Sequence, residues 1–366
     1  MRTELCDRFG IEHPIFGFTP SEHVAAAISR AGGLGVLGCV RFNDAAELDA
    51  ALTWMDEHTE GRPYGVDVVM PAKIPTEGTA IDLDALIPPE HRAFVDRTLA
   101  ELGVPPLAEE SHGTGVLGWL HSVARSHVDV ALQHPIKLIA NALGSPPVDV
   151  IEQAHRHDVP VAALAGKAEH ARRHVDNGVD IVVAQGYEAG GHTGEIASMV
   201  LVPEVVDAVG ADVPVLAAGG IGSGRQLAAT LALGASGGWL GSCWLTTAEY
   251  ALGLPASATQ QALLAAGSSD TVRTRIYTGK PARLLKTRWT EAWAQPDAPA
   301  PLPMPLQNLL VADAHQRITL SGDPSVVSMP VGQIVGRMNA IRPVAEVMSD
   351  LLREFDETLT RLDKLR

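Results

Sequence analysis

The side chains best suited to chemistry lie in the glycine-rich stretch 184–194. It offers an amide at Gln185, a carboxylate at Glu188 and an imidazole at His192, and it follows an apolar run, 181–184, that predicts a buried strand. Its four glycines let the backbone take positive φ angles and approach a ligand closely. This pattern favours the edge of an active site. A strand-to-helix turn with a solvated His and Glu is the alternative.

A second glycine-rich stretch, 217–225, has the features of an anion site. It follows an apolar run, contains Gly219 and Gly220, and precedes an expected helix. Exposed amide N–H groups beside a helix N-terminus bind phosphate. The next apolar run ends in another small loop, Gly241-Ser242. Phosphate sites of β/α barrels often use the loops after strands seven and eight, which these two are. Tight packing of glycine turns is the alternative.

Two other patterns do not carry chemistry. Residues 33–38 contain a literal GxGxxG, but it follows a helix and runs through a strand, the reverse of the order in a dinucleotide-binding turn. Glu188 and His192 are four residues apart, yet no third ligand stands at a metal-binding spacing. We therefore predict neither a dinucleotide fingerprint nor a metal site.

Short apolar runs alternate with helical segments along most of the chain. Helical periodicity and N-cap residues such as Ser21 and Asp44 mark the segments between the runs. This alternation predicts an α/β protein with an eightfold β/α (TIM) barrel rather than an open sheet. The expected strands are 14–18, 34–37, 64–69, 136–140, 159–164, 181–184, 215–218 and 238–241.

Two regions break the alternation. Prolines punctuate residues 71 to about 130, which we interpret as an elaborated crossing within the barrel. Residues 249–330 carry a basic cluster and a proline run, and they predict a smaller, mainly helical lid inserted after strand eight. Helical periodicity resumes over 331–352, so the expected barrel domain comprises 1–248 and 331–366.

The composition limits the classes of function. Aromatic residues make up only 4% of a chain that is 46% hydrophobic, which suits helices packed closely on parallel strands. The net charge of −15 argues against nucleic acid and anionic membranes as partners, and no run resembles a signal peptide or a membrane span. The three cysteines lack a CxxC spacing, so we expect buried, unpaired thiols in a cytoplasmic protein.

Together, these motifs resemble the nitronate monooxygenase (2-nitropropane dioxygenase) family, whose members are FMN-dependent β/α barrels with a second domain. The resemblance covers most of the chain, and it is more specific for the fold and the flavin than for the substrate. It rests on 184–194, 217–225, Ala232-Leu-Gly-Ala235, Ala31-Gly-Gly-Leu-Gly35 and Thr278-Gly-Lys-Pro-Ala-Arg283.

The resemblance implies a role for each residue of a flavin site. His192 would be the catalytic base that takes the α-proton of the substrate, or would position a nitronate over the flavin; the ordinary pKa of histidine suits proton transfer near neutrality. Gln185 would contact the flavin ring, and Gly220 with the 239–242 loop would hold the phosphate. The full set of implied FMN-binding residues is Gly17, Phe18, Asp67, Gln185, Gly190, Gly191, Gly219, Gly220, Trp239, Leu240, Gly241 and Ser242.

Several positions depart from the family pattern. Gly17-Phe18 stands where a Pro-Met pair is usual, and Asp67 replaces an Asn that commonly ends the third strand. In the last phosphate loop, Trp239 and Ser242 stand where Gln and Thr are usual. A charged Asp67 beside the ring would alter the reduction potential of the flavin. A hydrogen-bonded carboxylate at the strand end is the alternative.

Three hypotheses of function follow. The first is an FMN-dependent oxidation of small alkyl nitronates by O2. The second is an enoyl reductase or acyl-CoA dehydrogenase that acts on an acyl-thioester with NAD(P)H, and the third is a flavin-binding protein without turnover. A homodimer is compatible with the sequence, which does not fix the oligomeric state. In the second hypothesis, a basic cluster would bind a phosphate of the substrate or of the nucleotide. We otherwise interpret this cluster as a solvated charged surface. Its members are Arg273, Arg275, Lys280, Arg283, Lys286 and Arg288.

Overall fold

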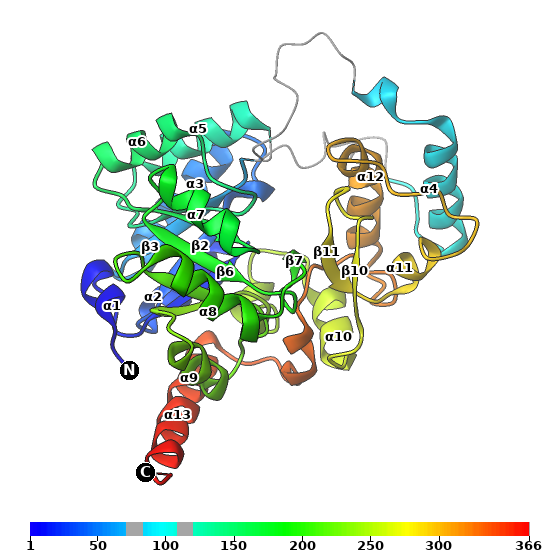
Figure 1. Cartoon of the computed structure of the whole chain (residues 1–366). Helices are drawn as coiled ribbons and strands as arrows, with labels where there is room; N and C mark the ends of the chain where they lie inside the picture. The colour runs from blue at the N-terminus through cyan, green and yellow to red at the C-terminus, as the bar shows by residue number, and fades with distance from the viewer. Residues whose placement is uncertain (71–82, 108–119, 366) are drawn as a thin grey trace.

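The computed structural model of the chain describes residues 1–70, 83–107 and 120–365. Its centre is a closed barrel of parallel strands in the order β1-β2-β3-β4-β5-β6-β8-β9, surrounded by helices (Figure 1). The eightfold β/α barrel predicted from the apolar runs is therefore confirmed. The barrel strands are β1 (Ile15–Thr19), β2 (Leu34–Gly38), β3 (Tyr64–Val68), β4 (Ile139–Asn141), β5 (Val161–Ala165), β6 (Ile181–Gln185), β8 (Val215–Ala218) and β9 (Gly237–Leu240).

The barrel strands are buried on both faces. Successive side chains of a strand point to opposite sides, so one set fills the barrel and the other packs beneath the helices. Phe16, Val36 and Val183 belong to the cluster inside the barrel, whereas Val182 and Ala184 pack in the outer layer. This double burial explains why the strands appear in the sequence as continuous apolar runs.

The outer helices begin where the sequence supplies caps. The hydroxyl of Ser21 accepts a hydrogen bond from the amide of Val24 at 3.4 Å, and the carboxylate of Asp44 accepts one from Glu47 at 2.9 Å. The helices of this layer are α2 (Glu22–Arg30), α3 (Ala45–His58), α5 (His121–Ala131), α6 (Val148–Arg156), α7 (Ala168–Asp176), α8 (Ser198–Val209), α9 (Gly224–Ala232) and α13 (Val344–Asp363). The helix α1 (Glu4–Phe9) instead packs against the cluster inside the barrel.

The C-terminal region differs from the helical segment expected over 331–352. A short 3-10 helix, η6 (Gln333–Arg337), is followed by α13, which begins directly after Pro343. Proline has no amide proton and disfavours the helical conformation of the residue before it, so a helix can begin at this position but cannot continue through it. The later helix packs against α9 and α2 and completes the outer layer (Figure 1).

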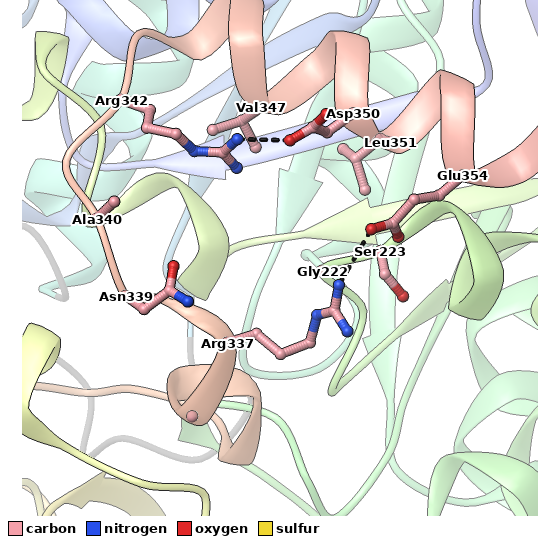
Figure 2. A pocket seen from close by; sticks show the side chains of 11 residues that line it. Gly222, Ser223, Arg337, Asn339, Ala340, Arg342, Val347, Asp350, Leu351 and Glu354 are labelled. Atoms are coloured by element: carbon pink, nitrogen blue, oxygen red, sulfur yellow. Dashed lines mark hydrogen bonds and ion pairs between the residues drawn. The ribbon is translucent and has the colours of Figure 1, made fainter.

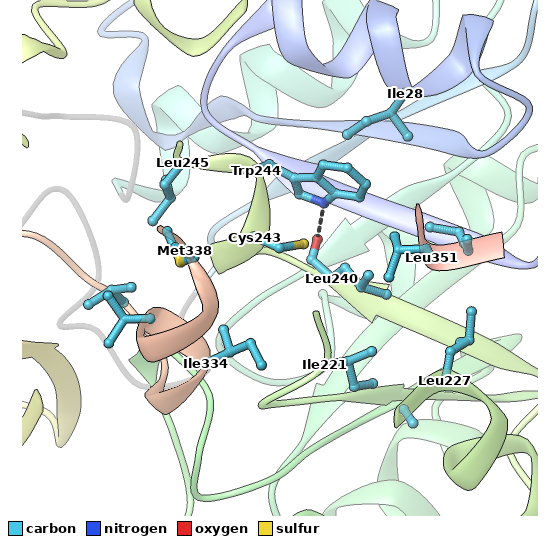
Figure 3. Packing of buried hydrophobic residues seen from close by; sticks show 14 of the residues in the cluster. Ile28, Ile221, Leu227, Leu240, Cys243, Trp244, Leu245, Ile334, Met338 and Leu351 are labelled. Carbon is cyan, nitrogen blue, oxygen red and sulfur yellow. Dashed lines mark hydrogen bonds between the residues drawn. The ribbon is translucent and has the colours of Figure 1, made fainter. Parts of the chain in front are cut away.

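Glycines in the first two strands allow α2 to approach the barrel closely. A Cβ built on Gly35 would lie 2.0 Å from a backbone carbonyl oxygen of α2, and one built on Gly17 would lie 2.4 Å from Ile28 Cδ1. Trp244 packs beside Ile28, and its indole Nε1 donates to the carbonyl of Leu240 at 2.8 Å (Figure 3). The GxGxxG pattern therefore serves strand-to-helix packing.

A second unit lies at one side of the barrel (Figure 1). Its strand β11 pairs antiparallel with β10 and with β7 (Gly191–His192), which belongs to the loop after β6. This small sheet was not anticipated within the helical lid, and it joins the lid to the 186–194 loop. The unit contains α10 (Ser257–Ala265), β10 (Thr271–Thr274), β11 (Ala282–Leu285), α11 (Arg288–Ala292) and α12 (Leu306–Ser321).

The helix α4 (Pro89–Glu101) packs with this second unit rather than with the barrel. It lies against α12, and the rings of Phe94 and Trp293 meet edge to face with centroids 4.8 Å apart (Figure 1). Residues 71–82 and 108–119 of the expected barrel crossing lie outside the described residues. We propose that the second unit comprises 249–330 together with α4.

The three cysteines, Cys6, Cys39 and Cys243, are buried and unpaired, as expected. Within the described ranges, no helix is both long and apolar enough to cross a membrane. The same residues contain no group of three or more His, Cys, Asp or Glu side chains placed to hold a metal ion.

Candidate active site

The carboxyl ends of the barrel strands bring four of the sequence-predicted residues to one place, here called the barrel mouth. Trp239 and Phe18 border the cluster inside the barrel, and their rings stack with centroids 6.3 Å apart. Asp67 and Gln185 face the same side, because their strand neighbours pack in the outer layer. These four side chains, Phe18, Asp67, Gln185 and Trp239, come from β1, β3, β6 and β9.

Two other predicted residues on these strands face away from the mouth. Leu240 packs in the outer hydrophobic layer, and Gly17 abuts Ile28 of α2. Any contribution of Leu240 or Gly17 to a ligand at the mouth is therefore limited to the backbone. The strand alternation explains this division, because each lies next to an inward-facing neighbour.

The small sheet holds His192 in the loop after β6, at the carboxyl end of the barrel strands. His192 lies opposite Ala282 in the β7–β11 pair, and its Nε2 lies 2.6 Å from the hydroxyl of Thr278. The ring of Tyr277 is 6.5 Å from the imidazole. Thr278 and Tyr277 were not among the predicted site residues. The motif 278–283 was the available signal, but it was recognised only as part of the family resemblance.

The imidazole of His192 is neutral at ordinary pH. Burial lowers its pKa to about 4, and the positive charge of Lys280 lowers it further. Lys280 is half-buried, which lowers the pKa of its own ammonium group. That ammonium has no ion pair or hydrogen bond to any described residue. A neutral base next to an unpaired cation suits a substrate that carries negative charge.

The buried side chain of Arg283 fixes the start of the 186–194 loop. Arg283 is 2% exposed, and its guanidinium donates to the carbonyl of Tyr187 through Nη2 at 2.9 Å and Nε at 3.2 Å. It also donates to the hydroxyl of Thr271 at 3.1 Å and lies 4.5 Å from the centroid of the Tyr187 ring. The interpretation of the basic cluster as a solvated surface is therefore wrong for Arg283, because its charge is buried against backbone oxygen and an aromatic face.

Glu188 has a structural task. Its carboxylate accepts hydrogen bonds from the amide of Ser198 at 3.0 Å and from the Ser198 hydroxyl at 2.9 Å. Ser198 is the first residue of α8, so the negative charge meets amide groups at a helix N-terminus. Glu188 thus anchors the loop to α8 rather than facing the barrel mouth with a free carboxylate.

A segment returning from the second unit, Pro330–Gln333 and here called the return segment, ties the site together. The amide of Gln333 donates to the carbonyl of Glu188 at 2.9 Å, and the amide of Gly332 donates to the hydroxyl of Ser242 at 2.9 Å. A Cβ built on Gly190 would lie 2.7 Å from the Gly332 nitrogen. No local sequence signal marks this contact, because it joins positions more than 80 residues apart.

Two loops present free amide groups next to each other, after β8 and β9. The structure shows no hydrogen bond from the amides of Gly219, Gly220, Gly241 or Ser242 to any acceptor among the described residues. Gly219 and Gly220 have φ angles of +104° and +69°, which strongly favour glycine. We call 219–221 and 241–243 the amide loops. They have the donors that a phosphate group requires.

Other protein groups occupy part of the α9 N-terminus, which was expected to contribute to this anion site. The amide of Gly224 donates to the carboxylate of Glu354 at 3.2 Å, and that of Gly222 donates to the side chain of Gln226 at 3.1 Å. The hydroxyl of Ser223 accepts from the Gln226 amide as the N-cap. Protein groups therefore already occupy the amides of Gly222, Gly224 and Gln226, and the amide loop 219–221 lies before the helix.

A pocket of about 420 Å³ lies between α13, residues 336–342 and the turn before α9 (Figure 2). Ion pairs border it, with Arg342 and Asp350 2.5 Å apart and Arg337 and Glu354 3.1 Å apart. None of the sequence-predicted site residues lines this pocket. The chemistry-bearing groups therefore concentrate at the barrel mouth and not here.

Comparison with known proteins decides the family. The family model described as nitronate monooxygenase matches residues 2–354. The chain belongs to the nitronate monooxygenase family. It is accordingly an oxidoreductase like nitronate monooxygenase, in a family whose members depend on flavin.

Full-length relatives agree with this assignment. A Mycobacterium tuberculosis protein provisionally named as a monooxygenase is 50% identical, and the match covers 100% of this chain and 99% of that protein. A Staphylococcus aureus protein provisionally named as a nitronate monooxygenase is 26% identical, with 98% of each chain covered.

Solved structures share the whole architecture. The nitroalkane oxidase from Streptomyces ansochromogenes superposes with a TM-score of 0.80 at 29% identity and covers 98% of this chain and 99% of its own. FabK from Thermotoga maritima superposes with a TM-score of 0.75 at 26% identity, with 100% of both chains covered.

Proposed function

We propose that this member of the family binds FMN at the barrel mouth and oxidises small alkyl nitronates with molecular oxygen. The observation that carries the proposal is the buried, neutral His192 in the loop after β6, which the return segment connects to Ser242 of the amide loops. When bound, FMN accepts electrons from the substrate and passes them to oxygen. The protein supplies orientation, electrostatics and proton transfer.

The residues present fit the parts of FMN. The amide loops provide N–H donors from Gly219, Gly220, Gly241 and Ser242 for the phosphate. The Ser242 hydroxyl accepts from the Gly332 amide, so its own O–H is left to donate to an anion. Phe18, Gln185 and Trp239 offer two aromatic faces and an amide to the flavin ring. Gly190 packs its backbone against the return segment, which in turn contacts Ser242 of the amide loops.

His192 serves as the base in this proposal. With the Nε2 proton donated to the Thr278 hydroxyl, the lone pair of Nδ1 is free to take the α-proton of a nitroalkane. The C–H bond then breaks, its electron pair stays on the substrate as the nitronate, and the proton resides on Nδ1. A substrate that arrives already as the nitronate is positioned by the same imidazole.

Lys280 balances the negative charge of the substrate. Its ammonium is unpaired among the described residues and close enough to His192 to depress the imidazole pKa. A nitronate beside both groups would be attracted to the ammonium, and its charge would raise the basicity of His192. The neutral imidazole of the free protein thus becomes a better base when the substrate is bound.

The rival function is an enoyl reductase acting on an acyl-thioester with NAD(P)H. We retain this candidate function because FabK superposes over its full length and has the same architecture at 26% identity. Because Arg283 is buried, this central member of the basic cluster is not available to bind the phosphate of a nucleotide. Nitronate oxidation is therefore the better supported proposal.

The test of this function begins with the chromophore. We expect the purified protein to be yellow, acid to release FMN, and oxygen consumption to depend on added alkyl nitronate. A colourless protein that cannot be reconstituted with FMN would contradict the proposed cofactor. A flavoprotein that consumes no oxygen with any small nitronate would contradict the proposed substrate.

The pH dependence of kcat/KM offers a separate prediction. Because the pKa of His192 is lowered to about 4, the base form persists well below neutrality, and we expect the acid limb of the profile near pH 4 rather than near 6.5. The Lys280→Met variant removes a nearby positive charge, so the His192 pKa rises and the limb moves to higher pH. Activity regained on return to pH 7 checks that acid has not unfolded the protein. A wild-type limb near pH 6.5 would contradict the assignment.

A further inference from the structure

Asp67 is a buried carboxyl group with no partner among the described residues. It is 2% exposed and lies at the barrel mouth, between Gly38 of β2 and Ala140 of β4. Neither of these neighbours has a polar side chain. Within the part of the chain that the structure describes, no group donates a hydrogen bond to the Asp67 carboxyl or forms an ion pair with it.

The ionisable groups packed around β3 do not supply a counter-charge. The 3-10 helix η1 (Cys39–Arg41) brings the Cys39 thiol close to β3. The pKa of this thiol is raised by its burial and by the charge of Asp67. Arg41 pairs with Glu22 at 2.5 Å, and its guanidinium covers an aromatic ring. His127 lies on α5 in the outer layer, where burial lowers its pKa. None of these described groups neutralises Asp67.

An unpaired buried carboxylate is so costly that the group takes up a proton instead. Burial accordingly raises the pKa of Asp67 to about 8. A protonated carboxyl presents one O–H donor and one carbonyl acceptor, the same pair of functions as an asparagine amide. A protonated Asp67 brings no negative charge to the mouth. It would therefore not alter the reduction potential of the flavin in the way expected for a charged carboxylate.

We propose that Asp67 is protonated in the working protein and donates a hydrogen bond from its carboxyl O–H to an acceptor atom of the flavin ring. This inference rests on the proposed binding of FMN at the mouth. A buried acid kept neutral so that it can donate a hydrogen bond is an established device at other active sites. The binding of FMN then requires the proton on Asp67.

The protonation state is tested first without the flavin, by denaturant unfolding of the apoprotein and its Asp67→Asn variant from pH 5 to 8. The unfolded chain releases this proton near the ordinary aspartate pKa, whereas the folded chain keeps it until about pH 8. The stability of the wild type relative to the variant therefore falls as pH rises, with the unfolding constant changing by up to tenfold per pH unit. A difference that stays flat over this range overturns the inference.

The contact with the flavin is tested by titrating both apoproteins with FMN from pH 6 to 9.5. We expect wild-type affinity to fall by up to tenfold per pH unit above about pH 8, the slope for one required proton, while Asp67→Asn stays level. Both proteins contain His192, Lys280 and the amide loops. Any pH dependence of FMN affinity that comes from these groups is therefore the same in both proteins and cancels in the comparison. Parallel pH dependences overturn the role of Asp67. If neither protein binds FMN at pH 6, the proposed FMN site itself is overturned. The proposed contact between Asp67 and the flavin is then overturned as well.

Discussion

The His192→Asn variant is expected to retain FMN and to lose about 10²–10⁴-fold in kcat/KM for a nitroalkane, the usual contribution of a positioned general base. Asparagine keeps a polar group near the Thr278 hydroxyl but cannot accept a proton. The imidazole contacts Thr278 and lies outside the amide loops, so FMN affinity should change little. Steady-state kinetics and FMN titration measure the two effects separately.

His315 provides the matched control for this substitution. It is also partly buried, and burial also lowers its pKa to about 4, but it belongs to α12, stacks on Tyr277 at 5.2 Å and contacts Ser328 at 3.1 Å. The His315→Asn variant should keep kcat/KM within a few-fold of the wild type. Equal losses in the two variants, or an unchanged rate in His192→Asn, would remove the assigned role of His192.

The Gly190→Ala variant is expected to weaken FMN binding and turnover together. The new methyl group would lie 2.7–2.8 Å from backbone atoms of Val331 and Gly332, which cannot move aside as a flexible side chain does. Displacing the return segment costs the hydrogen bonds to the Glu188 carbonyl and the Ser242 hydroxyl. Overpacking of about 1–3 kcal/mol and about 1 kcal/mol for each of the two hydrogen bonds predict a loss of roughly 3–5 kcal/mol in the free energy of unfolding.

Gly267→Ala is the control for adding a methyl group. A Cβ at this position would meet only the carboxylate of Asp270 at 3.3 Å, and the φ angle of Gly267 is not in the left-handed region. Denaturant unfolding and FMN titration of both variants should show a loss only for Gly190→Ala. If Gly190→Ala unfolds and binds FMN as the wild type does, the return segment does not hold the two loops together.

The barrel was predictable because its signals are local. Strands buried on both faces appear as apolar runs, and caps such as Ser21 and Asp44 mark helix starts within a few residues. Phe18, Asp67, Gln185 and Trp239 meet at the mouth because parallel strands of a closed barrel end on the same side. Their convergence followed from topology alone.

The supports of the site were not predictable, because each depends on a contact between distant parts of the chain. Thr278 reaches His192 across 86 residues, and Gly332 reaches Ser242 across 90. The short strand β11 of the second unit pairs with the two-residue strand β7, which carries no periodicity of its own. The burial of Arg283 likewise follows from tertiary packing against the Tyr187 ring and carbonyl. Sequence composition around Arg283 indicates only a basic cluster.

The choice between the two enzymatic functions depends on which molecule reduces the flavin. The most direct measurement mixes the FMN-loaded protein, without oxygen, with a small alkyl nitronate and, separately, with NADH or NADPH, and follows the absorbance of oxidised flavin. We expect rapid bleaching by the nitronate, slow or absent bleaching by either nicotinamide, and recovery of the absorbance when oxygen is admitted. Rapid bleaching by NADH or NADPH, with none by nitronates, would contradict nitronate oxidation as the function.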